Sequence, residues 1–352
     1  MRKKKQSYPL SFIHLLIGVF IVITILFYAR NAYFNMLTKK APSKILQSTD
    51  KMTSSEFSSY KKEFGEILLK SSPTEALAAL SDKLDSNAKV TRYCHSYAHE
   101  IGHMAFNKYG FADALTYIDD LCGSGYAHGV IEEYFVKIDD LGNAVTNACT
   151  VGSNAMSLES CYHGVGHGLM FYTNNDIPKS LSYCDWYTDT IARARCSEGV
   201  FMENFNSDER FHKSKYLKSN DPLYPCQEQT QFYKDSCYFY APDYYLILHD
   251  RDYKGAIELC KKAEAGFDSI CIKGVGSRAM KYNIAKPKFV EAVCMNAKGA
   301  YNISFCIDGM MSYYLVHTNS VSKSKAVCET LEDGNKSACY NAVTVRATHF
   351  LD

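Results

Sequence analysis

The first strong pattern along the chain is an apolar run from Phe12 to Ala29, interrupted only by His14 and Thr24. This run approaches the ~20 residues that a helix needs to cross a bilayer. Four cationic residues at positions 2–5 precede it, so the positive-inside rule leaves the N-terminus in the cytoplasm and exports the residues after the run. We therefore predict a cytoplasmic basic tail over 1–11 and a transmembrane anchor over 12–29. A cleavable signal peptide is the alternative, although no convincing small-residue cleavage site comes after the run.

Beyond the anchor the pattern changes twice. Residues 30–73 are predicted to form a juxtamembrane stalk, because the stretch from 41 is polar and mixed in charge. A short amphipathic pattern, EALAALSDKL, begins after Thr74. From there helix-length segments rich in aromatic residues alternate with a turn and a second, shorter helical pattern such as AIELC or FVEAVC. This succession predicts an all-α solenoid of stacked αα-hairpins, a superhelix, over residues 74–352.

Cysteine spacing gives the period of this array. Twelve of the 14 cysteines form six pairs separated by 11 or 12 positions, and the second members recur every 33 to 41 residues. Self-similarity at that period is typical of repeats in which each unit buries its apolar face against its neighbours. A small residue often stands three places after the second cysteine, and five glycines share this register position: Gly125, Gly164, Gly199, Gly274 and Gly309. We expect these glycines to let neighbouring helices approach closely.

The cysteines are interpreted as disulfides rather than metal ligands, because the short C-x2-4-C spacing of zinc sites is absent. Each bridge is predicted to join the end of one short helix to the start of the next long helix, and the first two cysteines to join the two helices of one hairpin. The seven predicted bridges, which stabilise the array by about 2–3 kcal/mol each, are Cys94–Cys122, Cys149–Cys161, Cys184–Cys196, Cys226–Cys237, Cys260–Cys271, Cys294–Cys306 and Cys328–Cys339.

In period and bridge count, residues 74–349 resemble the tetratricopeptide and Sel1-like helical-hairpin repeats, notably the exported, cysteine-rich kind. The resemblance implies a class of architecture and no binding residues. Disulfides persist in oxidising compartments, so the body is predicted to be extracytoplasmic, either periplasmic or at a cell surface. The formal net charge of only +1 argues against a nucleic-acid partner, which needs a basic face.

Histidines are concentrated in the first repeats, about 94–207, and the repeats over about 208–352 are predicted to be structural. Six of the 11 histidines lie between 95 and 167. The segment 99–103 reads HEIGH and resembles the zincin H-E-x-x-H motif. The resemblance implies His99 and His103 as zinc ligands and Glu100 as the general base, with His128, Glu132 or Glu133 as candidates for a third ligand. No metzincin extension is present after His103.

The repeat gives a second explanation for the same histidines. In register, His99, His128 and His167 occupy one position of three successive long helices, and Met202, Asp243, Ser277 and Ser312 occupy it later. His95 and His99 are four residues apart, as are His163 and His167, so each pair shares a helix face. Imidazoles from packed helices 8–10 Å apart reach a common ion. The predicted metal ligands are His99, His103, His128, His163, His167, Glu132, Glu203 and Met202.

Three hypotheses remain open from the sequence. The first is a membrane-anchored protein whose histidine-rich concave face binds Zn²⁺, or Cu because Met202 offers a soft thioether, and a peptide or envelope partner. The second is a zinc-dependent hydrolase that uses Glu100. The third is an interaction scaffold in which the histidines are buried polar residues that bond to nearby tyrosines.

Overall fold

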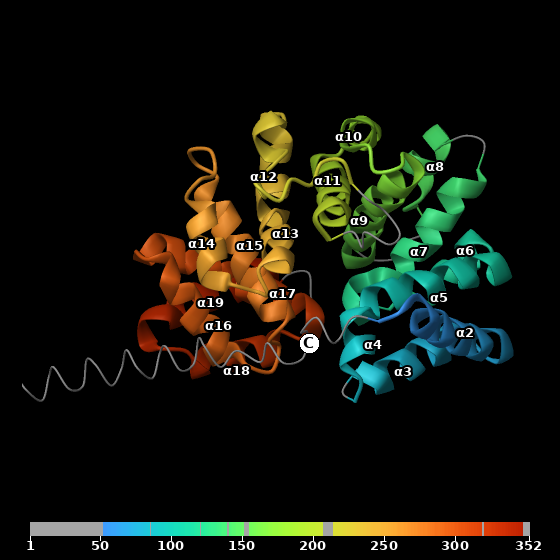
Figure 1. Ribbon diagram of the computed structural model, residues 1–352, viewed down its shortest axis with the longest axis horizontal. Helices are drawn as coiled ribbons and strands as arrows, with labels where there is room; N and C mark the ends of the chain where they lie inside the picture. The colour runs from blue at the N-terminus through green and yellow to red at the C-terminus, as the bar shows by residue number, and fades with distance from the viewer. Residues whose placement is uncertain are drawn as a thin grey trace, which may run out of the picture. The chain divides into compact units, whose positions relative to one another are not determined.

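The computed structural model describes residues 52–84, 86–119, 121–138, 141–150, 155–206, 214–318 and 320–347. Every regular element in this part of the chain is a helix, as the sequence pattern predicts (Figure 1). The predicted anchor over 12–29 lies outside the described residues. Among those described, no helix is both long and apolar enough to cross a membrane.

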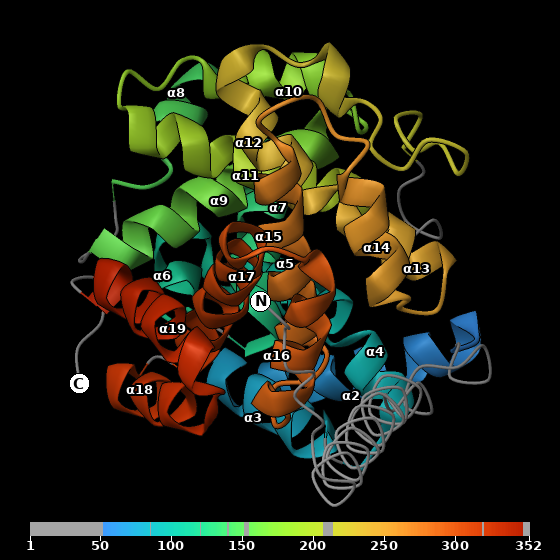
Figure 2. The same ribbon diagram turned by 90° about the vertical axis from the view of Figure 1, so that its left-hand side faces the viewer.

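Long helices in the described part carry the repeat. They are α5 (Cys94–Tyr109), α7 (Leu121–Lys137), α9 (Ala155–Tyr172), α11 (Thr190–Asn206), α12 (Gln231–Tyr240), α15 (Asp268–Lys281), α17 (Ala300–Thr318) and α19 (Asp333–Arg346). Each packs on the next in this order, so the chain forms helical repeats stacked along the sequence (Figures 1 and 2).

Shorter helices connect the long ones. They are α6 (Phe111–Leu115), α8 (Leu141–Asn147), α10 (Ile177–Cys184), η3 (Cys226–Glu228), α13 (Pro242–Leu248), α14 (Tyr253–Cys260), α16 (Pro287–Cys294), η4 (Met295–Ala297) and α18 (Val321–Thr330). Side-chain caps begin several of them. In α10 the carboxylate of Asp176 accepts from the backbone N–H of Lys179, and Asp252 does the same for Gly255 in α14.

The structure joins all 14 cysteines in the seven pairs predicted from the spacing. Five of the bridges join neighbouring helices, and the bridge from Cys149 to Cys161 joins the turn after α8 to α9. The bridge from Cys94 to Cys122 differs from the expectation, because Cys122 does not end a short helix. It lies in a left-handed turn at the start of α7, where Cys122, Gly123 and Ser124 all have positive φ.

Part of the predicted stalk is helical. Residues 54–70 form α2 (Ser54–Lys70), which packs with α3 (Pro73–Leu84) and the short α4 (Ala88–Arg92) beside α5. Phe57, Phe64 and Leu68 recur on one face of α2 and are buried, while its charged residues face outward. The mixed polarity that suggested a stalk is therefore the pattern of an amphipathic helix covering the first repeat.

Glycines bring pairs of long helices into backbone contact. A Cβ built on Gly129 in α7 would lie 2.0 Å from the carbonyl oxygen of His99 in α5. The equivalent contacts are 2.0 Å from Gly199 to the carbonyl oxygen of His163, and 1.8 Å from Gly309 to that of Lys273. Real Cβ atoms do not come so close, so the predicted role of Gly199 and Gly309 agrees with the structure. Gly129 plays the same role one turn beyond Gly125.

Candidate metal centre

Six histidines from three successive long helices gather inside the first repeats. His95, His99 and His103 come from α5, His128 from α7, and His163 and His167 from α9. The glycine contact between α5 and α7 occurs at His99 itself, and that between α9 and α11 at His163. Because the backbones touch at these points, imidazoles on neighbouring helices are brought within contact of one another.

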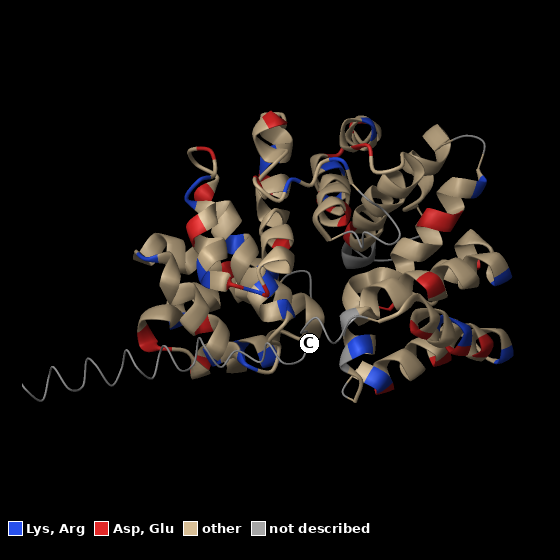
Figure 3. Ribbon diagram, viewed as in Figure 1, with Lys and Arg blue, Asp and Glu red and all other residues tan. Residues whose placement is uncertain are grey.

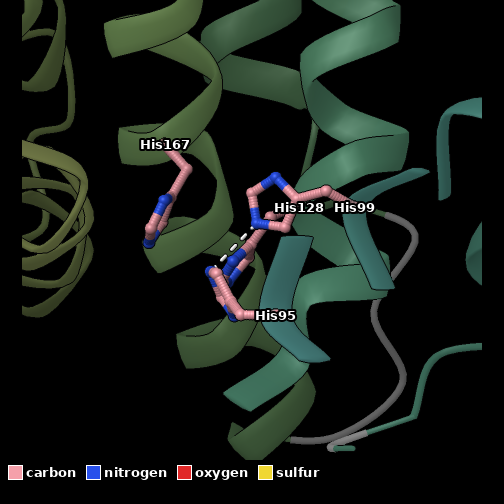
Figure 4. Close-up of side chains that lie close together, drawn as sticks. All are labelled: His95, His99, His128 and His167. Atoms are coloured by element: carbon pink, nitrogen blue, oxygen red, sulfur yellow. Dashed lines mark hydrogen bonds between the residues drawn. The ribbon is translucent and has the colours of Figure 1, made fainter. Parts of the chain in front are cut away.

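Four of these histidines converge on one point. One ring nitrogen from each of His95, His99, His128 and His167 lies within 4.8 Å of the other three (Figure 4). The Nε2 atoms of His95 and His99 are 3.0 Å apart. Two nitrogens bound to one tetrahedral zinc ion lie about 3.3 Å apart, since each Zn–N bond is about 2.0–2.1 Å. The spacing of the pair therefore fits two adjacent ligands of one ion.

Hydrogen bonds to Nδ1 fix the orientation of three of the rings. The Nδ1–H of His95 donates to the carbonyl oxygen of Cys122 at 2.7 Å. A carbonyl oxygen only accepts, so the proton is on Nδ1 and Nε2 carries the lone pair of a neutral ring. The left-handed turn at Cys122 directs this carbonyl at the ring.

Carboxylates orient the rings of His99 and His167 by accepting a hydrogen bond from Nδ1. The Nδ1–H of His99 donates to Glu132 at 3.0 Å, and that of His167 donates to Glu203 at 2.8 Å. Histidines that bind metals usually donate their other N–H to a carboxylate or a carbonyl, which fixes the tautomer and the ring orientation. The arrangement around His95, His99 and His167 has this form.

His128 lies at the centre and has no such partner. Its side chain is fully buried, and neither ring nitrogen makes a hydrogen bond within the described residues. Its ring stacks on that of His167 with centroids 4.0 Å apart. A buried polar group without a hydrogen-bond partner lowers stability by about 1–3 kcal/mol. The ring of His128 is such a group, because no neighbouring residue in the described part of the chain binds its nitrogens. A metal ion at the convergence point would bind one of them.

Protonation depends on burial and on the carboxylates. Burial, together with neighbouring charges, lowers the pKa of His95, His128 and His163 well below the usual range, so these rings are neutral and able to bind a metal at pH 7. Burial also disfavours the charged form of His99, yet the carboxylate of Glu132 outweighs it and raises the pKa. The site therefore attracts positive charge, which a cation would provide in place of the proton.

His103 and Glu100 belong to a neighbouring ionic group rather than to the four converging histidines. The Nε2–H of His103 donates to Glu132 at 2.8 Å, and Nδ1 lies 3.8 Å from Glu100. Against the effect of burial, these carboxylates raise the pKa of His103 to about 10. The carboxylate of Glu100 lies 2.6 Å from Nζ of Lys61 in α2. In a zincin, both histidines bind the ion and the glutamate lies beside it. The contacts of His103 and Glu100 form a different arrangement.

His163 and Met202 border the cluster. The Nε2 atom of His163 lies 3.2 Å from Nε2 of His167 and 3.3 Å from Sδ of Met202 in α11. Glu132, His167 and Glu203 also bring one donor atom each within 4.8 Å of one another. Since both carboxylates already accept from imidazole N–H groups, we interpret them as residues that orient the rings.

The prediction omitted one central residue. His95 was not among the predicted ligands, although its spacing of four from His99 places both on one helix face. The carbonyl of Cys122, which orients His95 through the left-handed turn, leaves no signal in the sequence.

Comparison with known proteins gives no match: no family model, no curated protein and no solved structure matches the chain.

Proposed function

We propose that this protein is an extracytoplasmic metal-binding protein, held at a membrane by the segment 12–29. His95, His99, His128 and His167 bind one ion through ring nitrogens. The observation that carries the proposal is the convergence of four imidazoles, three of them oriented through Nδ1, around a buried His128 that has no hydrogen-bond partner within the described residues. Seven disulfides support an oxidising compartment.

Zn²⁺ is the ion that the donor set favours first, because it commonly binds imidazole nitrogens and the 3.0 Å between the Nε2 atoms of His95 and His99 fits two adjacent ligands. Copper is the alternative, favoured by the thioether of Met202 next to His163. Glu132 and Glu203 balance part of the charge of a divalent ion without binding it directly. A peptide or envelope partner on the same face remains part of the proposal.

Metal analysis of the purified full-length chain tests this function. Wild-type protein is expected to carry one zinc or copper ion per chain after exposure to both metals. The variant His128→Leu removes the central ring and should carry none. His249→Gln changes a histidine at the end of α13, far along the chain from the cluster, and should keep the wild-type content. Equal metal content in His128→Leu and wild type would overturn the proposal.

A further inference from the structure

The donor geometry of α5 recurs in α9. In α5 the Nε2 atoms of His95 and His99 lie 3.0 Å apart. In α9 the Nε2 atoms of His163 and His167, which are also four residues apart, lie 3.2 Å apart. A carboxylate accepts from Nδ1 of the second histidine in each pair, at 3.0 Å for His99 and 2.8 Å for His167. Each helix therefore presents two ring nitrogens at a spacing that fits two adjacent ligands of one ion.

The next long helix packs on each histidine pair in the same way. A Cβ built on Gly125 in α7 would lie 2.8 Å from the carbonyl oxygen of His95 in α5. One built on Gly199 in α11 would lie 2.0 Å from the carbonyl oxygen of His163 in α9. These glycines share a register position of the repeat, and so do the two histidines that they contact. Residues at equivalent positions of α7 and α11 therefore face equivalent histidines.

The residue three places after each glycine contacts the histidine pair. In α7 this residue is His128, whose ring centroid lies 5.3 Å from those of His95 and His99. In α11 it is Met202, whose Sδ lies 3.3 Å from Nε2 of His163. Bonds of about 2.1 Å and 2.3 Å to one ion place a nitrogen and a sulfur ligand about 3.6 Å apart, which is close to that distance. The second helix pair therefore repeats the donor set of the first, with a thioether in place of one imidazole.

This second donor set is softer than the first. Thioether sulfur is a soft ligand that selects Cu(I), whereas Zn²⁺ and Cu²⁺ bind well to imidazole nitrogens alone. Every cysteine among the described residues is in a disulfide, so no thiolate competes for a soft ion there. A methionine sulfur forms no disulfide and stays available in the oxidising compartment that the bridges require. Two neutral imidazoles and a neutral thioether also suit a monovalent ion.

We infer that His163, His167 and Met202 form a second ion position, which takes Cu(I) through two ring nitrogens and one sulfur. This inference deepens the proposed function and rests on it in part, because His167 also belongs to the four-histidine site. The Nδ1–H of His167 donates to Glu203, so Nε2 holds the lone pair of the neutral ring and serves one ion at a time. Cu(I) at the second position therefore weakens zinc binding at the first.

X-ray absorption at the copper edge of the selenomethionine-labelled, full-length chain identifies the donors, because selenium scatters differently from nitrogen. The copper is kept as Cu(I) under argon, since copper in air is Cu²⁺. Wild type should show nitrogen and selenium neighbours. Met202→Leu preserves the side-chain volume, and it should lose the selenium neighbour and weaken Cu(I) binding about tenfold or more. His163→Gln should weaken Cu(I) binding similarly. Met311→Leu, which changes a fully buried methionine of α17, is the matched control and should behave as wild type.

Zinc binding by the same proteins separates the two sites. Met202→Leu should keep zinc and lose Cu(I), whereas His128→Leu should lose zinc and keep Cu(I). Copper without a selenium neighbour in wild type overturns the second position and leaves the four-histidine site intact. Loss of both ions in Met202→Leu also overturns it, as does full retention of zinc by wild type that has bound Cu(I). Absence of zinc from wild type, with Cu(I) binding that still depends on Met202, overturns the four-histidine site instead.

Discussion

The N-terminal and C-terminal repeats place different chemistry at the same position of the long helix. In α7 and α9 this position holds His128 and His167, both buried. In the C-terminal repeats it holds Asp243, in the short α13 that directly follows α12, and Ser277 in α15, both also buried. The close packing of the helix backbones is shared, since Gly199 and Gly309 bring the helices into contact in both regions. One scaffold therefore presents imidazole rings in one half and a charged pair in the other.

The two regions also differ in how their buried polar groups are satisfied. Asp243 and Arg278 compensate each other's charge. His128 has neither a charge partner nor a hydrogen bond in the described residues. Buried polar groups without partners are rare in folded proteins and require an explanation such as a missing ion. The contrast indicates that the buried charges of Asp243 and Arg278 balance each other, whereas the buried ring of His128 is suited to an additional ligand. Figure 3 shows acidic and basic residues interspersed along the helices of both regions.

The largest expected loss of stability comes from a substitution that pushes α5 and α7 apart. Gly129→Ala introduces a methyl group 2.0 Å from the carbonyl oxygen of His99, which should destabilise the fold by about 3 kcal/mol and abolish metal binding. Gly309→Ala makes the same change in the C-terminal half and should destabilise similarly while keeping the metal. Denaturant unfolding and metal analysis measure both quantities. Gly334→Ala is the control, because no atom lies within 4 Å of its added Cβ. Metal retained in Gly129→Ala would contradict the account.

Loss of one disulfide in the C-terminal repeats should lower stability by a smaller amount and leave metal binding unchanged. Replacing Cys328 and Cys339 by alanine opens a short loop and should cost about 2–3 kcal/mol of unfolding free energy. The metal content should be unchanged, because this bridge joins α18 to α19, outside the histidine repeats. Parallel loss of metal would show that the two halves are not independent.

Replacing His128 by leucine should stabilise the metal-free protein, whereas most substitutions in a protein core destabilise it. In metal-free protein His128→Leu removes two buried nitrogens without partners in the described part of the chain, so unfolding free energy should rise by about 1–2 kcal/mol. Zinc should raise the melting temperature of wild type and leave that of the variant unchanged. Ser277→Ala, at the equivalent position of α15, should keep the zinc response. A destabilised metal-free His128→Leu would contradict the interpretation of this ring as an unsatisfied ligand.

A further pair of expected effects on stability depends on pH. Because the folded pKa of His103 is raised to about 10, its stabilising contribution is fully present below its unfolded pKa of about 6.5 and is lost as pH rises through about 10. Metal-free His103→Gln should therefore be less stable than wild type by about 2 kcal/mol at pH 6 and nearly equal to it above pH 10.

His317 in the C-terminal half provides the opposite case. Burial lowers its pKa, so His317→Gln should be most favourable relative to wild type in acid, and the difference should vanish as pH rises above 6.5. Urea unfolding across this pH range tests both variants. The same pH dependence in both would contradict the assignment of His103 to an ionic group with Glu100 and Glu132.

The repeat was predictable because its signals are local and periodic. Cysteine spacing predicts the seven pairs, and the helix period places His128 and His167 on equivalent faces. The roles of the individual residues in the histidine cluster were harder to predict from the sequence. The H-E-x-x-H match suggested that His99, Glu100 and His103 act together on one ion, but Lys61 from α2 binds Glu100, and Glu132 from α7 accepts hydrogen bonds from both His99 and His103. Such contacts join residues far apart in sequence and leave no periodic pattern.

X-ray absorption of the zinc-loaded protein tests the central claim most directly, because it reads the atoms around the ion. The account predicts four nitrogen neighbours at about 2.0–2.1 Å with the outer-shell scattering of imidazole rings. It also predicts loss of this spectrum in His128→Leu and its persistence in His249→Gln. A first shell of oxygen or sulfur atoms, or an unchanged spectrum in His128→Leu, would contradict a metal centre built from these four histidines.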